Sequence, residues 1–228
     1  MKKLFLTSDG LVTPQLQKAF LELVDKNPKD IKVLFVPTAS KAKQDSAYLE
    51  RKSAYFKHCD EELMGLGIPK ENLSWLDIHP VKSSEAGVSQ IAKQFNRVNN
   101  TASVGDLNSY DVMYVCGGNT FYLLHEVKRT GFDKKIIDFI NSEKVYVGVS
   151  AGSILVGPDI SIAEPFDAND VKFNDTTGLK MTEKIICPHY DKKNKDIVND
   201  FDNKNNCKVL RLRDDQAWEE IGSNTRVI

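Results

Sequence analysis

Residues 145–156 read VYVGVSAGSILV and join an apolar run to a serine flanked by two glycines. The run VYVGV predicts a buried β-strand, and the apolar residues after Gly152 predict that a helix follows. Gly148, Ser150 and Gly152 have the spacing Gly-x-Ser-x-Gly, which in a strand-turn-helix context places a serine hydroxyl at the carboxyl end of a sheet. An ordinary glycine-rich turn could carry the same five residues, so the interpretation depends on the rest of the chain.

Outward from this segment, short β-rich runs alternate with longer helical patterns. Strands are predicted at 2–7, 31–36, 73–78, 112–116, 145–149, 184–187, 208–212 and 217–221. Helices are predicted from Thr13-Pro14, over 46–66, around Ile91, Phe95 and Val98, over 121–128 and over 132–141, and 164–181 is predicted to be loop or a short hairpin. Strand and helix in alternation favour one α/β domain with a mostly parallel sheet and helices on both faces.

Composition excludes several classes of protein. The 228 residues carry 31 basic and 32 acidic side chains, a formal net charge of −1. The chain lacks the excess of basic residues that would indicate a nucleic-acid partner. It also has no apolar run that approaches the length of a membrane span. Cys59, Cys116, Cys187 and Cys207 lack Cys-x-x-Cys spacing, so we expect buried free thiols, no metal site and a cytoplasmic location.

A nucleophilic serine needs a base, and the chain offers four histidines: His58, His79, His125 and His189. His189 follows a predicted strand, so we expect it at the same sheet edge as Ser150. The third member should be a carboxylate that orients the imidazole. The acids between Ser150 and His189 are Asp159, Glu164, Asp167, Asp170, Asp175 and Glu183, and spacing alone does not choose among them.

A second glycine turn, Cys116-Gly117-Gly118-Asn119-Thr120, also follows a predicted buried strand. Paired glycines let backbone N–H groups approach a ligand, which suits a donor of an oxyanion hole. A phosphate cradle or a plain turn are the other readings, and neither phosphate-loop pattern is present. Cys116 belongs to the strand, so we expect it in the core.

Together, Gly117–Phe121, Gly148–Ser153 and Pro188-His189-Tyr190 resemble the S51 serine peptidases, the family of dipeptidase E and cyanophycinase. Leu212–Ala217 resembles the final strand-turn-strand of that family. The resemblance covers most of residues 1–228, taken as a single domain, and implies a three-layer αβα sandwich similar to class I glutamine amidotransferases. It implies Ser150 as nucleophile, His189 as base, and the amides of Gly118 and Ala151 as oxyanion hole, with no cofactor.

Two positions depart from the family pattern. In the dipeptidases an aspartate follows the serine, and counting from Ser150 lands on Pro165, which has no carboxylate. We therefore expect the adjacent Glu164 to complete a Ser-His-Glu triad, or Asp167 if the loop is shifted. The Asp-specific dipeptidases also carry an arginine soon after the histidine, and residues 190–196 contain none.

These features predict a serine peptidase that hydrolyses small peptides through an acyl-enzyme. One alternative is a hydrolase of another acyl bond, such as an ester or a cyanophycin-like β-aspartyl amide. The other is a non-catalytic homologue that kept the serine turn. The sequence does not indicate whether the chain is a monomer or a dimer.

Overall fold

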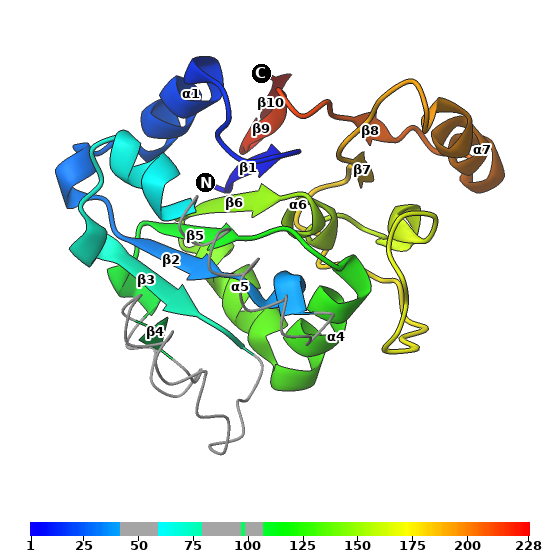
Figure 1. Cartoon of the computed structure of the whole chain (residues 1–228), viewed down its shortest axis with the longest axis horizontal. Coiled ribbons are helices and arrows are strands. Elements are labelled where there is room, and N and C mark those ends of the chain that lie inside the picture. Colours follow the sequence, from blue (N-terminus) through cyan, green and yellow to red (C-terminus); the bar gives the residue numbers. More distant parts are fainter. Residues whose placement is uncertain (42–58, 79–96, 99–106) are drawn as a thin grey trace.

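The computed structural model describes residues 1–41, 59–78, 97–98 and 107–228 (Figure 1). Within them, an eight-stranded sheet has the order β10-β9-β1-β6-β5-β2-β3-β4. Neighbours from β1 to β4 in that order are parallel, whereas β9 pairs antiparallel with both β1 and β10. The strands are β1 (Lys3–Thr7), β2 (Val33–Val36), β3 (Leu73–Leu76), β4 (Arg97–Val98), β5 (Val112–Val115), β6 (Val145–Val149), β9 (Ala217–Ile221) and β10 (Asn224–Val227).

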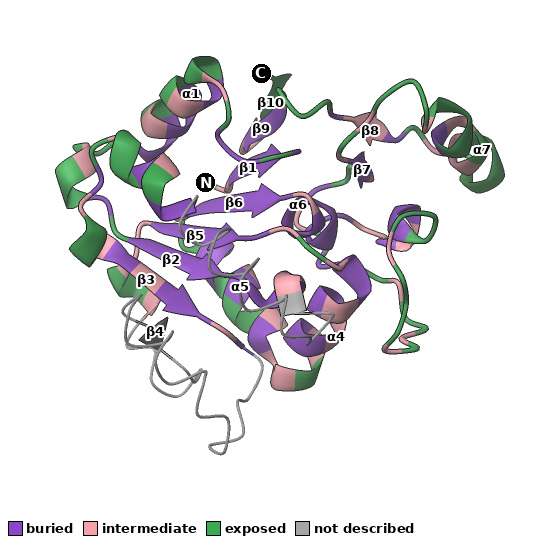
Figure 2. Cartoon of the chain, in the orientation of Figure 1, coloured by how far each residue is buried: buried purple, intermediate pink, exposed green. Residues whose placement is uncertain are grey.

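Helices cover both faces of this sheet (Figures 1 and 2). They are α1 (Pro14–Val24), an unlabelled helix over 59–65, α4 (Thr120–Thr130), α5 (Phe132–Asn141), α6 (Ala151–Leu155) and α7 (Lys195–Asn205). Short 3-10 turns are η1 (Pro28–Asp30), η2 (Thr38–Lys41), η3 (Lys70–Asn72), η4 (Leu107–Ser109) and η5 (Ser161–Ala163).

The sheet separates two hydrophobic cores because side chains alternate along each strand. On β1, Leu4 and Leu6 pack into the core that contains Leu124 of α4 and Ile136 of α5. Phe5 points to the other face and packs with Phe20 of α1. The predicted α/β architecture, with a mostly parallel sheet between two helical layers, is therefore confirmed.

A small two-stranded sheet stands apart from the main one. Its strands, β7 (Ile186–Cys187) and β8 (Leu210–Arg211), are parallel, with Cys187 opposite Arg211. Both strands were expected within a single sheet, and they pair only with each other. The pairing continues past the strand ends, because Leu212 donates to the Cys187 carbonyl and Tyr190 donates to the Leu212 carbonyl, each at 3.0 Å.

Several local predictions are confirmed. Thr13 caps α1 by accepting a hydrogen bond from the Leu16 N–H, with Pro14 as the first helical residue. Residues 164–181 form irregular chain with one bridge, Asp159 to Thr177. All four cysteines are free, as expected, and Cys59, Cys116 and Cys187 are buried, but Cys207 is only half-buried, which differs from the expectation.

Other predictions lie wholly or partly outside the described residues. The helix expected over 46–66 is seen only from 59 to 65, and Ile91, Phe95, His58 and His79 fall in undescribed stretches. Val98, expected in a helix, lies in β4 beside β3. None of the helices in the described part of the chain is long and apolar enough to cross a membrane.

Candidate active site

Ser150 occupies a sharp turn between β6 and α6. Its backbone φ is +49° and its ψ is −109°, a conformation that residues other than glycine rarely adopt. The turn is held from below, since the Ser150 N–H donates to the Thr7 carbonyl at 3.1 Å. The following Ser153 hydroxyl contacts the carbonyls of Thr7 and Gly148, both at 2.8 Å. The turn therefore rests on the carboxyl ends of two neighbouring strands, β1 and β6.

The two flanking glycines are required by packing. A Cβ at Gly148 would lie 2.6 Å from the Gly152 carbonyl oxygen, and one at Gly152 would lie 2.2 Å from the Val115 carbonyl oxygen. Both distances are too short for a non-bonded contact between a carbon and an oxygen atom. Strand β6, helix α6 and the end of β5 therefore approach closely only because these positions lack side chains.

His189 reaches Ser150 from outside the main sheet. Its Nε2 lies 3.0 Å from the Ser150 Oγ, which is hydrogen-bonding distance. His189 follows β7 and also has a positive φ, +53°. His189 and Ser150 were expected close together at one sheet edge, and their side chains are in contact. The strand before His189, however, belongs to the small sheet and not to the main one. His125 lies elsewhere, on α4, beside Glu126.

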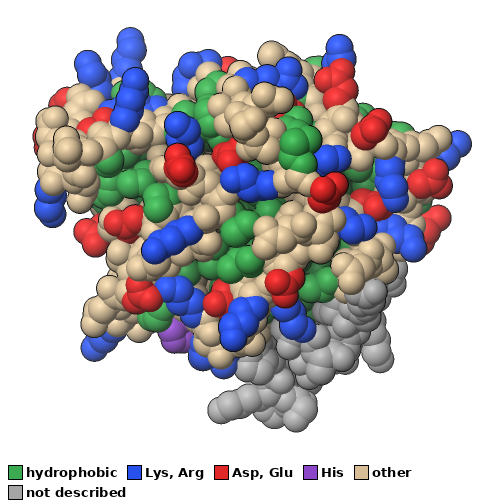
Figure 3. Space-filling model, turned by 180° about the vertical axis from the view of Figure 1, so that it is seen from behind, with side chains coloured by type: hydrophobic (Ala, Val, Ile, Leu, Met, Phe, Trp, Pro, Cys, Tyr) green, Lys and Arg blue, Asp and Glu red, His purple; other side chains and the backbone are tan. Residues whose placement is uncertain are grey.

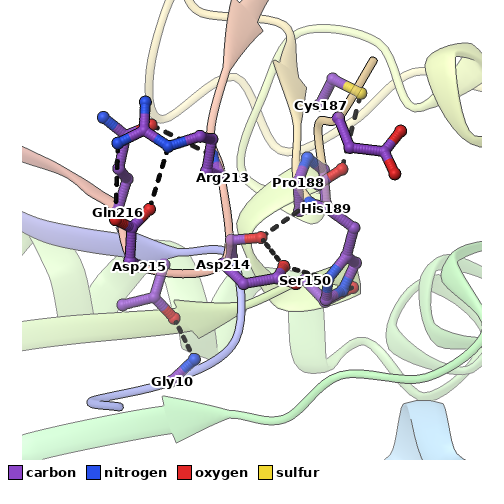
Figure 4. Close-up of polar contacts among 12 residues, drawn as sticks. Gly10, Ser150, Cys187, Pro188, His189, Arg213, Asp214, Asp215 and Gln216 are labelled. Carbon is purple, nitrogen blue, oxygen red and sulfur yellow. Dashed lines mark hydrogen bonds and ion pairs between the residues drawn. The ribbon is translucent and has the colours of Figure 1, made fainter. Parts of the chain in front are cut away.

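The carboxylate that contacts the imidazole is Asp214. Its Oδ1 lies 2.6 Å from Nδ1 of His189, so Ser150, His189 and Asp214 form one continuous chain of contacts (Figure 4). The reason is the parallel pairing of β7 and β8. Cys187 and Arg211 are paired at the carboxyl ends of the two strands. His189 lies two residues after Cys187 and Asp214 three residues after Arg211, so the two side chains lie next to each other.

Glu164, the expected acid, does not contact His189. It is exposed at the end of η5, and its carboxylate makes no hydrogen bond or ion pair with any residue the structure describes. The alternative, Asp167, accepts a hydrogen bond from the Thr120 N–H at 2.8 Å instead. The expectation of a Ser-His-Glu contact chain was therefore wrong, because the 164–181 loop turns these acids toward α4 or solvent.

Ser8 connects the histidine and the aspartate from beneath. It is fully buried directly after β1. Its hydroxyl donates to Asp214 Oδ1 at 3.0 Å and accepts from the His189 backbone N–H at 2.7 Å. The Ser8 hydroxyl therefore positions both the Asp214 carboxylate and the backbone of His189.

The Gly117-Gly118 turn lies against Ser150. A Cβ at Gly117 would stand 3.2 Å from the Ser150 Cβ, and one at Gly118 would stand 2.3 Å from the Ala39 carbonyl oxygen. Gly118 has a φ of +140°, and Asn119 donates to the same Ala39 carbonyl at 2.9 Å. Among the described residues, the N–H groups of Gly118 and Ala151 have no hydrogen-bond acceptor.

Comparison with known proteins places this chain in a family. The family model of peptidase family S51 matches residues 84–228. The chain belongs to peptidase family S51. As a member, it is a serine-type peptidase, and so a hydrolase.

Relatives of this S51 peptidase include proteins of several bacteria. An uncharacterized peptidase of Listeria monocytogenes is 32% identical over 196 residues, 83% of this chain and 78% of the relative. A crystal structure of a candidate peptidase E from the same species covers 100% of this chain and 98% of its own, with a TM-score of 0.71 and 28% identity. A peptidase from an acI-B1 actinobacterium shares the fold, with a TM-score of 0.64 and 17% identity.

Sequence reasoning missed Asp214 and Ser8 in this S51 peptidase. The search for an acid stopped at His189, because it assumed the order serine, acid, histidine. The available signal was that Asp214 follows the predicted strand 208–212 as His189 follows 184–187. Ser8 gave no comparable signal, since a serine after a first strand is unremarkable in sequence.

The remaining reactive groups near Ser150 are limited. Cys187 lines the adjoining pocket, but burial raises the pKa of its thiol to about 11. It is therefore protonated at neutral pH and a poor nucleophile. The described part of the chain holds no cluster of three His, Cys, Asp or Glu side chains that could bind a metal. Cys116 is fully buried in the core, as expected.

Proposed function

We propose that this chain hydrolyses small peptides with Ser150 as nucleophile, His189 as general base and Asp214 as the orienting acid. The observation that carries the proposal is the unbroken series of contacts, 3.0 Å from Ser150 to His189 and 2.6 Å from His189 to Asp214. A hydroxyl becomes an effective nucleophile when an imidazole can take its proton, and a carboxylate on the far nitrogen fixes the ring and stabilises its charge.

In the first half-reaction, the Ser150 Oγ attacks the scissile carbonyl carbon while His189 Nε2 takes the hydroxyl proton. Negative charge develops on the carbonyl oxygen, and we assign its stabilisation to the N–H groups of Gly118 and Ala151. The C–N bond then breaks, and His189 returns the proton to the leaving amine. The product is an ester between Ser150 and the acyl half of the peptide.

In the second half-reaction, water attacks this ester while His189 takes one of its protons. The bond to Ser150 breaks, and the serine oxygen recovers the proton from His189. Asp214 stays ionised throughout. The positive φ at Ser150 supports this assignment, because such a turn, a nucleophile elbow, lifts the hydroxyl away from its own helix toward an incoming carbonyl.

Residues 1–228 are proposed to act as one S51-like domain with small peptides as substrates. The pocket beside Ser150 has a volume of about 200 Å³, below the usual 300–1,000 Å³ of ligand pockets. A cytoplasmic location is proposed on the four free thiols, since proteins in reducing compartments keep thiols unpaired.

Two assays of purified protein test the proposal: hydrolysis of a dipeptide panel and covalent labelling by a fluorophosphonate probe. We expect Ser150→Ala to lose both hydrolysis and labelling. The matched control is Ser223→Ala, which changes an exposed serine in the β9–β10 turn and should leave both unchanged.

Equal hydrolysis by wild type and Ser150→Ala would reject the serine mechanism. Labelling of the wild type without dipeptide hydrolysis, together with turnover of esters or β-aspartyl amides, would assign the site to another acyl bond. A wild type that neither labels nor hydrolyses any substrate would point to a non-catalytic homologue.

A further inference from the structure

The pocket beside Ser150 has one apolar side and one acidic group. Ile154, Ile162 and Phe166 contribute the apolar surface, and Asp167 contributes a carboxylate. Ser150 and His189 line the same pocket, so a residue bound there is next to the bond under attack.

The size of the pocket limits what it can hold. Its volume is about 200 Å³, below the roughly 300–1,000 Å³ of pockets that hold drug-sized ligands. A pocket of this size suits a single residue of a peptide.

The charge of the pocket selects against an acidic residue. Among the described residues that line it, Asp167 is the only carboxylate and no lysine or arginine is present. Lys192 and Lys193, which follow His189, are exposed and do not belong to this lining. An aspartyl side chain would meet a like charge with no described cation to offset it, whereas an ammonium group would be attracted.

Asp167 and Thr120 retain hydrogen-bonding capacity that a ligand could use. The Asp167 Oδ2 accepts from the Thr120 N–H, and Oδ1 has no partner among the described residues. Thr120 also lines the pocket and is 1% exposed, and its hydroxyl has no described hydrogen-bond partner. A buried hydroxyl without a partner is rare in native proteins, which points to a ligand group that completes it.

We propose that this pocket binds the first residue of a peptide, with its free α-ammonium group paired with Asp167 and its uncharged side chain against Ile154, Ile162 and Phe166. The inference rests on the proposed peptidase function and specifies its substrate. The enzyme would then release an uncharged N-terminal residue and disfavour peptides that begin with aspartate.

The test compares kcat/KM for Leu-Gly, Asp-Gly, N-acetyl-Leu-Gly and N-acetyl-Lys-Gly. We expect Leu-Gly to exceed each of the others at least 10-fold. N-acetylation removes the α-ammonium group and keeps the apolar side chain. N-acetyl-Lys-Gly keeps an ammonium group, but on the side chain, so it distinguishes the two sources of that group.

Asp167→Asn provides the matched variant, because its amide oxygen can still accept from the Thr120 N–H. We expect at least a 10-fold loss of kcat/KM on Leu-Gly, mostly through KM, and little change on N-acetyl-Leu-Gly. The control is Asp170→Asn, an exposed acid of the same loop that does not line the pocket. Fluorophosphonate labelling of Ser150 in each variant reports whether the nucleophile is intact.

The outcomes separate this inference from the proposed function. If labelling succeeds, the pocket assignment is overturned by a preference for Asp-Gly, by equal turnover of either acetylated peptide, by no dipeptide turnover, or by an Asp167→Asn variant with wild-type kinetics. If labelling of the wild type fails and no peptide is hydrolysed, the serine mechanism itself is rejected and the substrate assignment with it.

Discussion

At the scale of single residues, the position of one carboxylate determines which acid the proposed mechanism assigns to His189. Asp214 lies 2.6 Å from His189 Nδ1 and is also hydrogen-bonded to the buried Ser8 hydroxyl. Both the ring and the carboxylate are therefore fixed before substrate arrives. Glu164 has neither contact, although it lies closer to Ser150 in sequence.

Replacing the acid tests this assignment directly. We expect Asp214→Asn to lower kcat/KM by about 1,000- to 10,000-fold, because an amide neither holds the required imidazole tautomer nor stabilises its charged form. Glu164→Gln should retain wild-type kinetics within about twofold, since its carboxylate has no described partner. The reverse pattern, with Glu164→Gln inactive and Asp214→Asn active, would restore a Ser-His-Glu arrangement.

At the residue level, the contact between Ser150 and His189 could be predicted from local sequence patterns. Ser150 and His189 were identified because each follows a predicted strand, and the structure brings them into contact. The partner of His189 could not be chosen by pattern, because any of several loop carboxylates could be folded toward it. Asp214 is selected by the register of β7 on β8, a non-local pairing that chain order does not reveal.

At the scale of elements, the serine turn depends on close approach between β5, β6 and α6. The strand-turn-helix order around Ser150 was predictable, since VYVGV is apolar and Gly152 marks the turn. The division of the later strands between two sheets was not, because short apolar runs do not indicate which strand will pair with which. Only the contacts beyond β7 and β8 show that the small sheet supplies both His189 and Asp214.

A single methyl group tests this close approach. Gly152→Ala would place Cβ 2.2 Å from the Val115 carbonyl oxygen, so β5 and α6 would have to separate. We expect a loss of about 1–3 kcal/mol in the free energy of unfolding, measured by urea denaturation, together with loss of fluorophosphonate labelling.

Gly65→Ala is the control for that substitution. Gly65 is exposed and helical, and nothing lies within 4 Å of an added Cβ, so this change should stabilise the protein by about 0.4–1 kcal/mol. A Gly152→Ala variant as stable and as reactive as wild type would contradict the packing described for the turn.

At the scale of the whole molecule, the charge is nearly balanced. Figure 3 shows Lys and Arg side chains interspersed with Asp and Glu over the face opposite to the view of Figure 1. With a formal net charge of −1, no strong overall field steers substrates, so selectivity must come from groups beside Ser150. The balanced composition therefore supports a specificity set by the pocket.

One ion pair joins distant parts of the chain and makes stability depend on pH. Glu220 on β9 lies 2.5 Å from Lys2 Nζ, and its Oε2 accepts from Thr182 at 2.7 Å and from Trp218 at 3.1 Å. Burial alone would raise the pKa of Glu220, but these partners outweigh it and hold the pKa below its ordinary value.

A lowered carboxylate pKa stabilises the fold above the pKa of the unfolded chain, and this contribution is lost as pH falls through the folded-state pKa. We expect the thermal midpoint of wild type to fall on acidification from neutral pH to below about 4, and Glu220→Gln to show a smaller fall. Glu164→Gln, an exposed acid without a described partner, should follow wild type. Parallel pH curves for wild type and Glu220→Gln would contradict this role.

The position of β1 between β6 and β9 has a consequence for the order of events during synthesis. Thr7 and Ser8 support the serine turn and the His189–Asp214 pair, yet they are made long before residues 214–221. In a chain emerging from the ribosome, β1 can therefore pair only along the edge that contacts β6 until β9 has been made. We therefore expect the contacts from Ser150 through His189 to Asp214 to form only after residues 214–221 have been made and have joined the fold.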